Sequence, residues 1–383
     1  MRFSILACLT LLFGLLGLCL SAQEYRSISG YDNNLDHPEY GAAGALLPAV
    51  GTVGFADGIS EPAGPDRPNP RTISNLIFMQ NSLADDVRGL SAYTWAWGQF
   101  IDHDITLSPD HLDETFDIPV PTFDAFFDPD GTGTAVIPMH RSDYDPATGL
   151  SVNNPRRYEN GISAFVDASA VYGSDEERAD WLRTFSDGKL KTSTGDLLPF
   201  NTTTGEYDDP IDPTAPEMAM PLPFVQKWFV AGDVRANENP FLTAMHTIFM
   251  REHNRLCDEL KTGNPNWDDE QLYQEARKLV GGEMQAIVFE EWLPTLGIEV
   301  PAYTGYDADI DPGILNAFNT AAYRYGHTTI NNLLLRMDNE GNYLPEGNIS
   351  LRDAFFNPDA TLEVGGIEPY LIGMATVVEQ DFD

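Results

Sequence analysis

Cysteine is scarce in this chain, because only Cys8, Cys19 and Cys257 occur among 383 residues. The first two lie in an apolar N-terminal segment that we expect to be removed, so the mature chain can form no internal disulfide. Cys257 stands beside Leu256 and Leu260 in a helical pattern, which favours a buried, inert thiol over a nucleophile. Bound ions or cofactors could supply the stabilisation that disulfides would otherwise provide.

Basic residues are also few: 22 Lys and Arg stand against 59 Asp and Glu, a formal net charge of −37 at pH 7. A surface this acidic repels nucleic acid and anionic membranes, so we expect neither as a partner. The same charge suits a salty medium, a cationic partner or bound divalent cations.

The apolar run Ile5–Leu20 follows a single basic residue, Arg2. It is short for a membrane span and no basic cluster follows it. Residues 1–22 are therefore predicted to be a signal peptide, with Leu20-Ser21-Ala22 as the cleavage site. We expect a secreted, extracellular protein without a membrane span in the mature chain.

Hydrophobic residues make up 42% of the chain, which is ample for a core, while 32 Gly and 27 Pro predict long loops between helices. Residues 23–75 show no clear period and are predicted to form an extended arm around the body. Helix boundaries are expected at Ser91, as a cap, and at Asn239 with Pro240 in the first turn. A break is expected near Gly281–Gly282.

The segment 95–109 reads W-A-W-G-Q-F-I-D-H-D-I-T-L-S-P. On a helix, Gln99 and His103 are four residues apart and share a face, while Asp102 and Asp104 flank the histidine. A polar cluster on an aromatic helix needs partners when it is buried. Taken alone, a solvated D-H-D at a helix end explains the pattern equally well.

In I-S-A-F-V-D-A-S-A-V-Y-G-S, Ser163, Phe165, Asp167 and Ser169 are spaced by two. An extended segment would place two hydroxyls, a carboxylate and a backbone carbonyl on one side. Such oxygen ligands suit Ca²⁺ better than zinc or iron. A half-buried strand is the alternative, unless a second carboxylate joins the set, and Asp104 is the candidate.

The segment G-D-V-R-A-N-E-N-P places Arg235 and Glu238 in a loop just before a helix, where a ligand could face them. The helix that follows carries His246, Glu252 and His253. The two histidines are seven residues apart, not the four of a zinc H-E-x-x-H motif, so a charged helix face is predicted instead.

His327 follows the helical run N-A-F-N-T-A-A-Y-R-Y-G within residues 312–335. A lone histidine in such a run is more often a satisfied core residue than a ligand.

Considered together, these stretches resemble the animal-type haem peroxidases of the peroxidase–cyclooxygenase superfamily. The matching motifs occur in family order from about residue 25 to the end: W-G-Q-F-I-D-H-D, F-V-D-A-S-A-V-Y-G-S, G-D-V-R-A-N-E, M-H-T-I-F-M-R-E-H-N-R-L and Y-R-Y-G-H-T. The resemblance implies a mainly α-helical haem-peroxidase domain over residues 23–383, with long loops and little β structure.

The resemblance also implies roles for the haem side of the site. His103 would be the distal histidine, Gln99 would hold water or a halide beside it, and Arg235 would be the distal arginine. His327 would be the proximal ligand of haem b, and Arg324 would lie near a haem propionate.

Two further groups follow from the resemblance. Asp102 and Glu238 would be the carboxylates that such enzymes ester-link to haem methyl groups. A Ca²⁺ ion would be bound by five residues: Asp104, Ser163, Phe165 through its carbonyl, Asp167 and Ser169.

The function implied is that of a secreted haem peroxidase, in which hydrogen peroxide oxidises a halide, a pseudohalide or a phenol. A haem-free, calcium-stabilised binding or adhesion module, or an inactive fragment, is the alternative. Fatty-acid dioxygenation is disfavoured, because the radical-forming tyrosine of those relatives stands three residues before the proximal histidine, where this chain has Arg324.

Two departures from the family pattern matter. Asn239 stands where some members link a methionine to the haem, so no third bond is expected. The family also continues past the equivalent of M-A-T-V-V-E-Q-D-F-D, with an asparagine that hydrogen-bonds the proximal histidine. We therefore expect a domain lacking its C-terminal part, with His327 weakly supported and apolar surface uncovered on residues 312–335.

Overall fold

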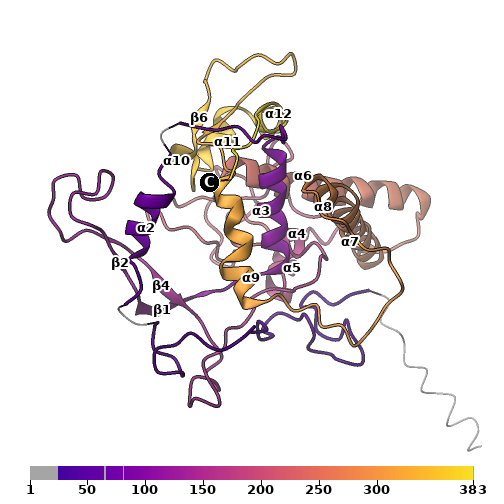
Figure 1. The fold of residues 1–383 in the computed structure, drawn as a ribbon. Coiled ribbons are helices and arrows are strands. Elements are labelled where there is room, and N and C mark those ends of the chain that lie inside the picture. Colours follow the sequence, from indigo (N-terminus) through magenta and orange to yellow (C-terminus); the bar gives the residue numbers. More distant parts are fainter. Residues whose placement is uncertain (1–24, 64–65, 81, 383) are drawn as a thin grey trace, which may run out of the picture.

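The computed structural model describes residues 25–382 except 64–65 and 81, and the predicted signal peptide lies outside this range. Figure 1 shows α3 near the centre of the molecule, with the other helices around it and long loops below and to the left. No helix in the described residues is long and apolar enough to cross a membrane.

The helical elements are α2 (Pro70–Ile77), α3 (Tyr93–Ile105), α4 (Ser169–Tyr172), α5 (Glu176–Leu182), α6 (Pro240–Gly263), α7 (Asp269–Ala286), the π-helical η1 (Ile287–Trp292), α8 (Leu293–Thr295), α9 (Asn316–Thr320), the 3₁₀-helical η2 (Ala322–Thr328), α10 (Leu351–Ala354), α11 (Asp359–Glu363) and α12 (Glu368–Thr376). The strands form three antiparallel pairs: β1 (Asp110–Thr115) with β4 (His140–Ser142), β2 (Ile118–Pro119) with β3 (Val136–Ile137), and β5 (Leu333–Leu334) with β6 (Ile349–Ser350). The predicted mainly α-helical fold with little β structure is confirmed.

Helix α3 is buried on every side, because ten of its 13 residues are inaccessible to solvent. It packs against α6, whose Phe249 ring stacks on Phe100 with centroids 5.2 Å apart and lies 5.6 Å from Trp97. Such aromatic contacts fix the helix through apolar burial. The aspartates and histidine of α3 are buried with it, so they require partners from other segments.

The loop before α6 passes very close to α4. A Cβ atom on Gly232 would lie 2.4 Å from the carbonyl oxygen of Ser169 and 2.5 Å from the amide nitrogen of Tyr172. Only glycine fits this approach, which brings the residues that follow it against α3.

The predicted cap of α6 is confirmed: the Asn239 side chain accepts a hydrogen bond from the amide of Leu242, and Pro240 stands in the first turn. The predicted cap of α3 is wrong. That helix begins at Tyr93 without a side-chain cap, because Ser91 instead forms an isolated antiparallel bridge with Val378.

The predicted break at Gly281–Gly282 is also wrong, since both residues lie inside α7. The position of Gly281 lies close to the backbone of Asp167, with an added Cβ 3.6 Å from its carbonyl oxygen. This is an ordinary van der Waals distance, so α7 runs through Gly281 without a close approach that would require glycine there. Residues 312–335 are not one helix either, since α9, η2 and β5 divide them.

The two histidines of α6 are buried, so the predicted charged helix face is wrong at both positions. His246 Nδ1 lies 3.0 Å from the carbonyl oxygen of Ala170, and His253 Nδ1 lies 2.8 Å from the hydroxyl of Tyr172. Both are core residues that tie α6 to α4; His253 has a partner on each ring nitrogen, whereas the buried Nε2 of His246 has none among the described residues. Cys257 is buried as predicted, and burial raises the pKa of its thiol to about 12.

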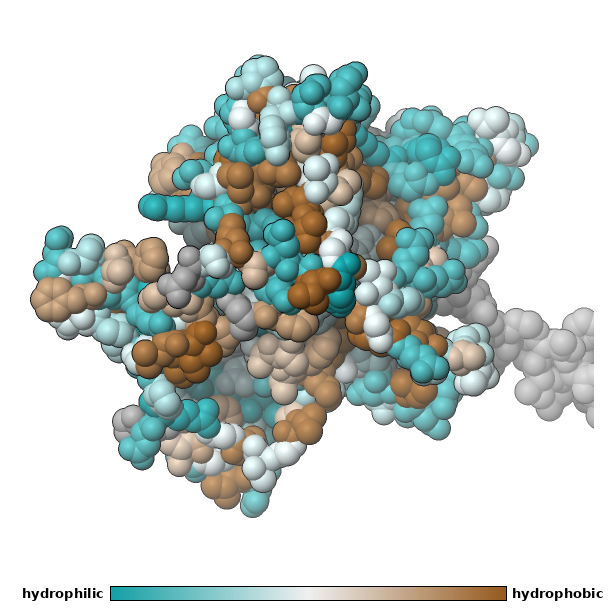
Figure 2. All heavy atoms as spheres, turned by 45° about the horizontal axis from the view of Figure 1, so that its top comes forward, coloured by the Kyte–Doolittle hydropathy of each residue, from teal (hydrophilic) through white to brown (hydrophobic). Residues whose placement is uncertain are grey.

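Apolar side chains also reach the surface, and Figure 2 shows brown apolar groups among teal hydrophilic ones on one face of the molecule. Within residues 312–335, four large apolar side chains are more than a third exposed: Leu315, Phe318, Tyr325 and Leu333. Single exposed apolar side chains are common on protein surfaces, so these four alone identify no interaction site.

Candidate functional site

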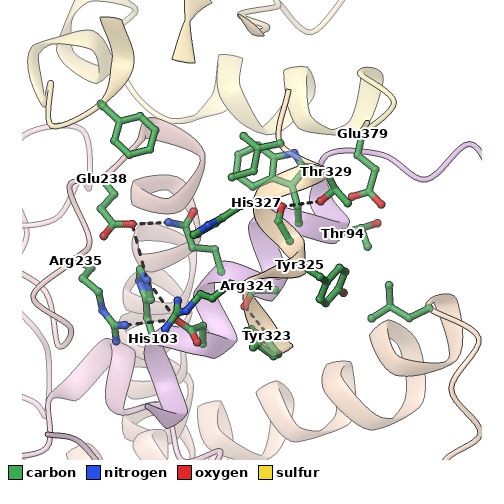
Figure 3. Close-up of a pocket in the computed structure, with 18 of the residues that line it drawn as sticks. Thr94, His103, Arg235, Glu238, Tyr323, Arg324, Tyr325, His327, Thr329 and Glu379 are labelled. Atoms are coloured by element: carbon green, nitrogen blue, oxygen red, sulfur yellow. Dashed lines mark hydrogen bonds and ion pairs between the residues drawn. The ribbon is translucent and has the colours of Figure 1, made fainter. Parts of the chain in front are cut away.

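A cavity of about 500 Å³ lies between α3, the loop before α6, and η2. Figure 3 shows His103 and His327 reaching it from different elements, α3 and η2. The structure brings all the predicted catalytic and haem-binding residues to its walls: Gln99, Asp102, His103, Arg235, Glu238, Arg324 and His327. The roles of the individual residues stay predictions.

His103 is surrounded by carboxylates that do not reach hydrogen-bonding distance. Its Nε2 lies 3.9 Å from Asp102 Oδ2 and 4.0 Å from Glu238 Oε2, and its buried Nδ1 has no hydrogen-bond partner among the described residues. Burial, reinforced by the charge of Arg235, lowers the pKa of His103 well below its usual value. The shift favours the neutral imidazole, the form that a proton acceptor must start from.

Arg235 is held in place by Asp233, a residue that the sequence analysis missed. The Nε and Nη2 atoms of Arg235 donate to the two Asp233 carboxylate oxygens, each at 2.8 Å, and Nη2 also donates to the Thr106 carbonyl oxygen at 2.9 Å. Burial alone would raise the pKa of Asp233. The charges of Arg235 and His103 and the hydrogen bonds from Arg235 have the larger effect, so the pKa of Asp233 is lowered. A two-pronged charged pair of this kind fixes the guanidinium orientation.

Gln99 is oriented by a chain of hydrogen bonds. Asn239 Nδ2 donates to Gln99 Oε1 at 3.0 Å, and Gln99 Nε2 donates to Glu238 Oε2 at 2.6 Å. Since the Asn239 oxygen caps α6, its amide group must point its nitrogen at Gln99. The sequence predicted the cap, but not this second contact.

Glu238 supports a prediction about pH. Burial raises the pKa of Glu238 to about 7, partly offset by Arg235. Between pH 4.5 and 7 the folded chain then holds more protons at this site than the unfolded chain, so this carboxyl contributes less stability as pH rises. Glu238→Gln should therefore gain stability relative to the parent chain between pH 5 and 8, by on the order of 2 kcal/mol. Urea unfolding across this range measures the gain.

The control for this effect is Glu259→Gln, whose carboxyl is 69% exposed on α6. Its free energy of unfolding should equal that of the parent chain at every pH. If the free energies of unfolding of Glu238→Gln and the parent chain change with pH in parallel, Glu238 is ionised throughout this range.

Asp102 lies next to two arginines in the wall of the cavity. Its Oδ2 accepts from Arg324 Nη1 at 2.9 Å and lies 3.4 Å from Arg235 Nη1, while its buried Oδ1 has no partner in the described residues. Burial raises the pKa of Asp102, and the two arginines act against that shift. Arg324 is therefore paired with Asp102 in this structure.

His327 lies in η2, and no hydrogen bond from another described residue reaches its ring. Burial, with the nearby charge of Arg324, lowers the pKa of His327. The shift favours the neutral imidazole, which is the form that binds iron.

A second polar cluster lies on the other side of α3, where Asp104 and Asp167 are buried together. Ser163 Oγ donates to Asp167 Oδ2 at 2.8 Å, and Ser169 Oγ donates to the Asp104 carbonyl oxygen at 2.7 Å. Burial and the neighbouring Asp167 raise the pKa of Asp104 well above its usual value, and burial raises that of Asp167.

The structure thus brings together four of the five predicted calcium ligands. The fifth, Phe165, has its amide nitrogen 3.2 Å from Ser163 Oγ, and no described contact places its carbonyl oxygen in the cluster. Two carboxylates and two hydroxyls form an oxygen-rich set of the kind that hard cations prefer.

A sequence model of the animal haem peroxidase family matches residues 25–383, and the chain belongs to this family. The predicted resemblance is thereby confirmed. The chain is 34% identical to thyroid peroxidase of Sus scrofa over 406 residues, covering 93% of this chain and 43% of that protein. It is 34% identical to the peroxidasin homolog of Mus musculus over 393 residues, covering 92% of this chain and 26% of that protein. The chain therefore spans less than half the length of these two relatives.

Solved structures agree with this assignment. Peroxidase A from Dictyostelium discoideum superimposes with a TM-score of 0.83 at 30% identity, covering 94% of this chain and 70% of that one. A fatty acid alpha-dioxygenase from Arabidopsis thaliana gives a TM-score of 0.71 at 18% identity. The second similarity shows a shared fold only.

Proposed function

We propose that this chain binds haem b and uses hydrogen peroxide to oxidise a small substrate. The observation that supports this function best is one cavity with the neutral His103 and the ion-paired Arg235 on one side and His327 on another. The residues fit a haem: an imidazole for the iron, arginine for the propionates, and an Asp102 oxygen left without a partner.

Haem, when bound, supplies the redox-active iron at which peroxide is reduced. His103 accepts the proton of one peroxide oxygen and delivers it to the other, which leaves as water. Arg235 stabilises the negative charge that develops on the departing oxygen, and its pairing with Asp233 fixes its direction beforehand. Gln99, oriented by Asn239, would hold water or a halide beside His103, and His327 would bind the iron.

Asp102 and Glu238 are proposed to form ester bonds to the haem methyl groups, because both carboxylates line the cavity. Haem should then stay with the chain through denaturing electrophoresis after peroxide treatment. The double variant Asp102→Asn, Glu238→Gln should release it. If only free haem is recovered from the parent chain, no such bonds form.

Asp104, Ser163, Phe165, Asp167 and Ser169 are proposed to bind Ca²⁺. Two buried carboxylates whose pKa values are raised repel each other when ionised, and a divalent cation would relieve that repulsion. Since Asp104 adjoins His103, loss of the ion would also disturb the distal helix.

EDTA is therefore expected to lower the unfolding temperature and to shift the haem absorption band, because a bound ion stabilises the folded state by mass action. Differential scanning calorimetry and metal analysis measure both effects, with added Ca²⁺ as the reversal control. Purified, folded chain without one Ca²⁺ per molecule would disprove the site.

The proposed substrates are halides, pseudohalides and phenols, and the proposed location is extracellular. Turnover of iodide, thiocyanate and guaiacol by the haem-loaded chain with hydrogen peroxide tests the activity. A folded chain without peroxide-dependent turnover of any of the three would favour the haem-free binding module.

A further inference from the structure

A groove of about 570 Å³ lies between the N-terminal arm, β4 and α9. Four arginines line it: Arg67, Arg141, Arg156 and Arg157. The described residues on its walls include no Asp or Glu, although acidic residues outnumber basic ones by 59 to 22 in the whole chain. Positive charge is therefore concentrated in this groove, although the chain as a whole is strongly acidic.

The groove's positive charge is only partly neutralised. Glu114 is shared by two arginines, at 2.7 Å from Arg156 Nη1 and 3.5 Å from Arg141 Nη1. Within the described residues, Arg67 and Arg157 have no carboxylate within ion-pair distance, and Arg157 Nη2 only donates to the Leu47 carbonyl oxygen at 3.1 Å. Guanidinium groups left in this state attract carboxylates and other oxyanions.

One of the four arginines, Arg156, is firmly held in the wall of the groove. Arg156 is only 3% exposed, and its guanidinium stacks 3.8 Å from the centre of the Tyr144 ring. The Nε–H donors of Arg156 and Arg157 are buried without a hydrogen-bond partner in the described chain. Buried polar atoms without partners cluster where a polar ligand completes a site.

Apolar side chains form the rest of the walls. Val53, Phe116 and Met139 line the cavity, and each is at least a third exposed. A ligand with an apolar body would cover this surface and gain free energy from doing so.

We propose that this groove binds a small organic carboxylate with an aromatic or aliphatic body, whose carboxylate contacts Arg67 and Arg157. A long polyanion fits less well, because it would extend from the groove over a surface whose net charge is −37. A small monoanion meets only the local positive charge. The site is separate from the haem cavity and does not depend on the peroxidase function.

Isothermal titration of the purified full chain with 4-phenylbutyrate tests the proposal. We expect saturable binding of one molecule per chain with a dissociation constant on the order of 1 mM, typical of a ligand of this size. The neutral analogue 4-phenylbutyramide should bind at least roughly tenfold more weakly, because it lacks the charge that the arginines recognise.

Three variants test whether 4-phenylbutyrate binds in this groove. The double variant Arg67→Gln, Arg157→Gln should weaken 4-phenylbutyrate binding by roughly tenfold or more. Arg352→Gln, at an exposed arginine lining a different groove, should leave it unchanged. Ala317→Asp adds a carboxylate to the exposed wall without removing a native side-chain contact, and should weaken binding even if the double variant folds poorly.

Three results would overturn the proposal. Equal binding of acid and amide, or unchanged binding in both groove variants, would show that the arginines recognise no carboxylate here. Binding of inorganic phosphate without binding of 4-phenylbutyrate would show that the apolar walls contribute nothing. Peroxidase turnover, assayed in parallel, reports on the haem site and is expected to stay at the parent level in all these variants.

Discussion

Replacement of His327 by alanine is expected to abolish tight haem binding while leaving the apo chain folded. His327 lies in η2 on the cavity wall, and its lowered pKa favours the neutral imidazole that iron requires. Without that ligand the iron has no bond to the protein at this position. Titration of the apo chain with haem, followed in the Soret region, should give a shifted and weakened band that does not saturate at one haem per chain.

Two controls separate loss of the ligand from loss of structure. His111→Ala, in the β1–β4 pair, should bind haem like the parent chain, because His111 contacts Asp143 and not the cavity. Added imidazole should restore a parent-like band to His327→Gly by occupying the vacated position. An unchanged Soret band and full turnover in His327→Ala would reject His327 as the iron ligand.

Replacement of His103 by glutamine should leave haem binding intact and slow peroxide consumption by roughly 10²–10⁴-fold, the usual contribution of a general acid–base group. The expectation depends on position and charge state together. His103 faces the cavity from α3, and burial keeps its imidazole neutral and able to accept a proton. Stopped-flow absorbance of the haem-loaded variant at increasing hydrogen peroxide gives the second-order rate constant.

Asp233→Asn is an informative companion to His103→Gln. It removes the charge that holds Arg235, and also a carboxylate oxygen 3.6 Å from His103 Nδ1, but it keeps the His103 side chain, so a smaller decrease is expected. Its effect should not add to that of Arg235→Lys, because Asp233 and Arg235 act as a pair. A His103→Gln variant that consumes peroxide at the parent rate would show that another group transfers the proton.

The parts of this site that follow from local geometry could be predicted from the sequence. Gln99 and His103 share a face because helical residues four apart always do. Asn239 caps α6 because the residue before Pro240 offers a side-chain oxygen to the first turn. Neither prediction needed knowledge of the rest of the chain.

Contacts between distant segments could not be predicted in this way. Ser91 has the chemistry of a cap, but its pairing with Val378 decided the start of α3. Gly281 has a low helix propensity, but it lies inside α7, which continues to Ala286. The Asn239–Gln99 contact joins residues 140 positions apart, and no local pattern specifies it.

The proposed calcium cluster shows what spacing alone can and cannot predict. Spacing by two predicted that Ser163, Phe165, Asp167 and Ser169 converge, yet this segment is not a strand. Ala168 adopts a left-handed conformation with φ 67°, which turns the chain into α4, and its amide lies 3.3 Å from Asp104 Oδ2. The side chains meet because the chain turns around the carboxylate of Asp104, a geometry that alternation alone does not contain.

Haem reconstitution of the purified chain, followed by peroxide-driven iodide oxidation, tests the haem-peroxidase assignment most directly. The assignment predicts a saturable Soret band at one haem per chain, and iodide oxidation that requires both haem and hydrogen peroxide. A chain with native helical circular dichroism and bound Ca²⁺ that leaves added haem free, and oxidises no iodide, would contradict it.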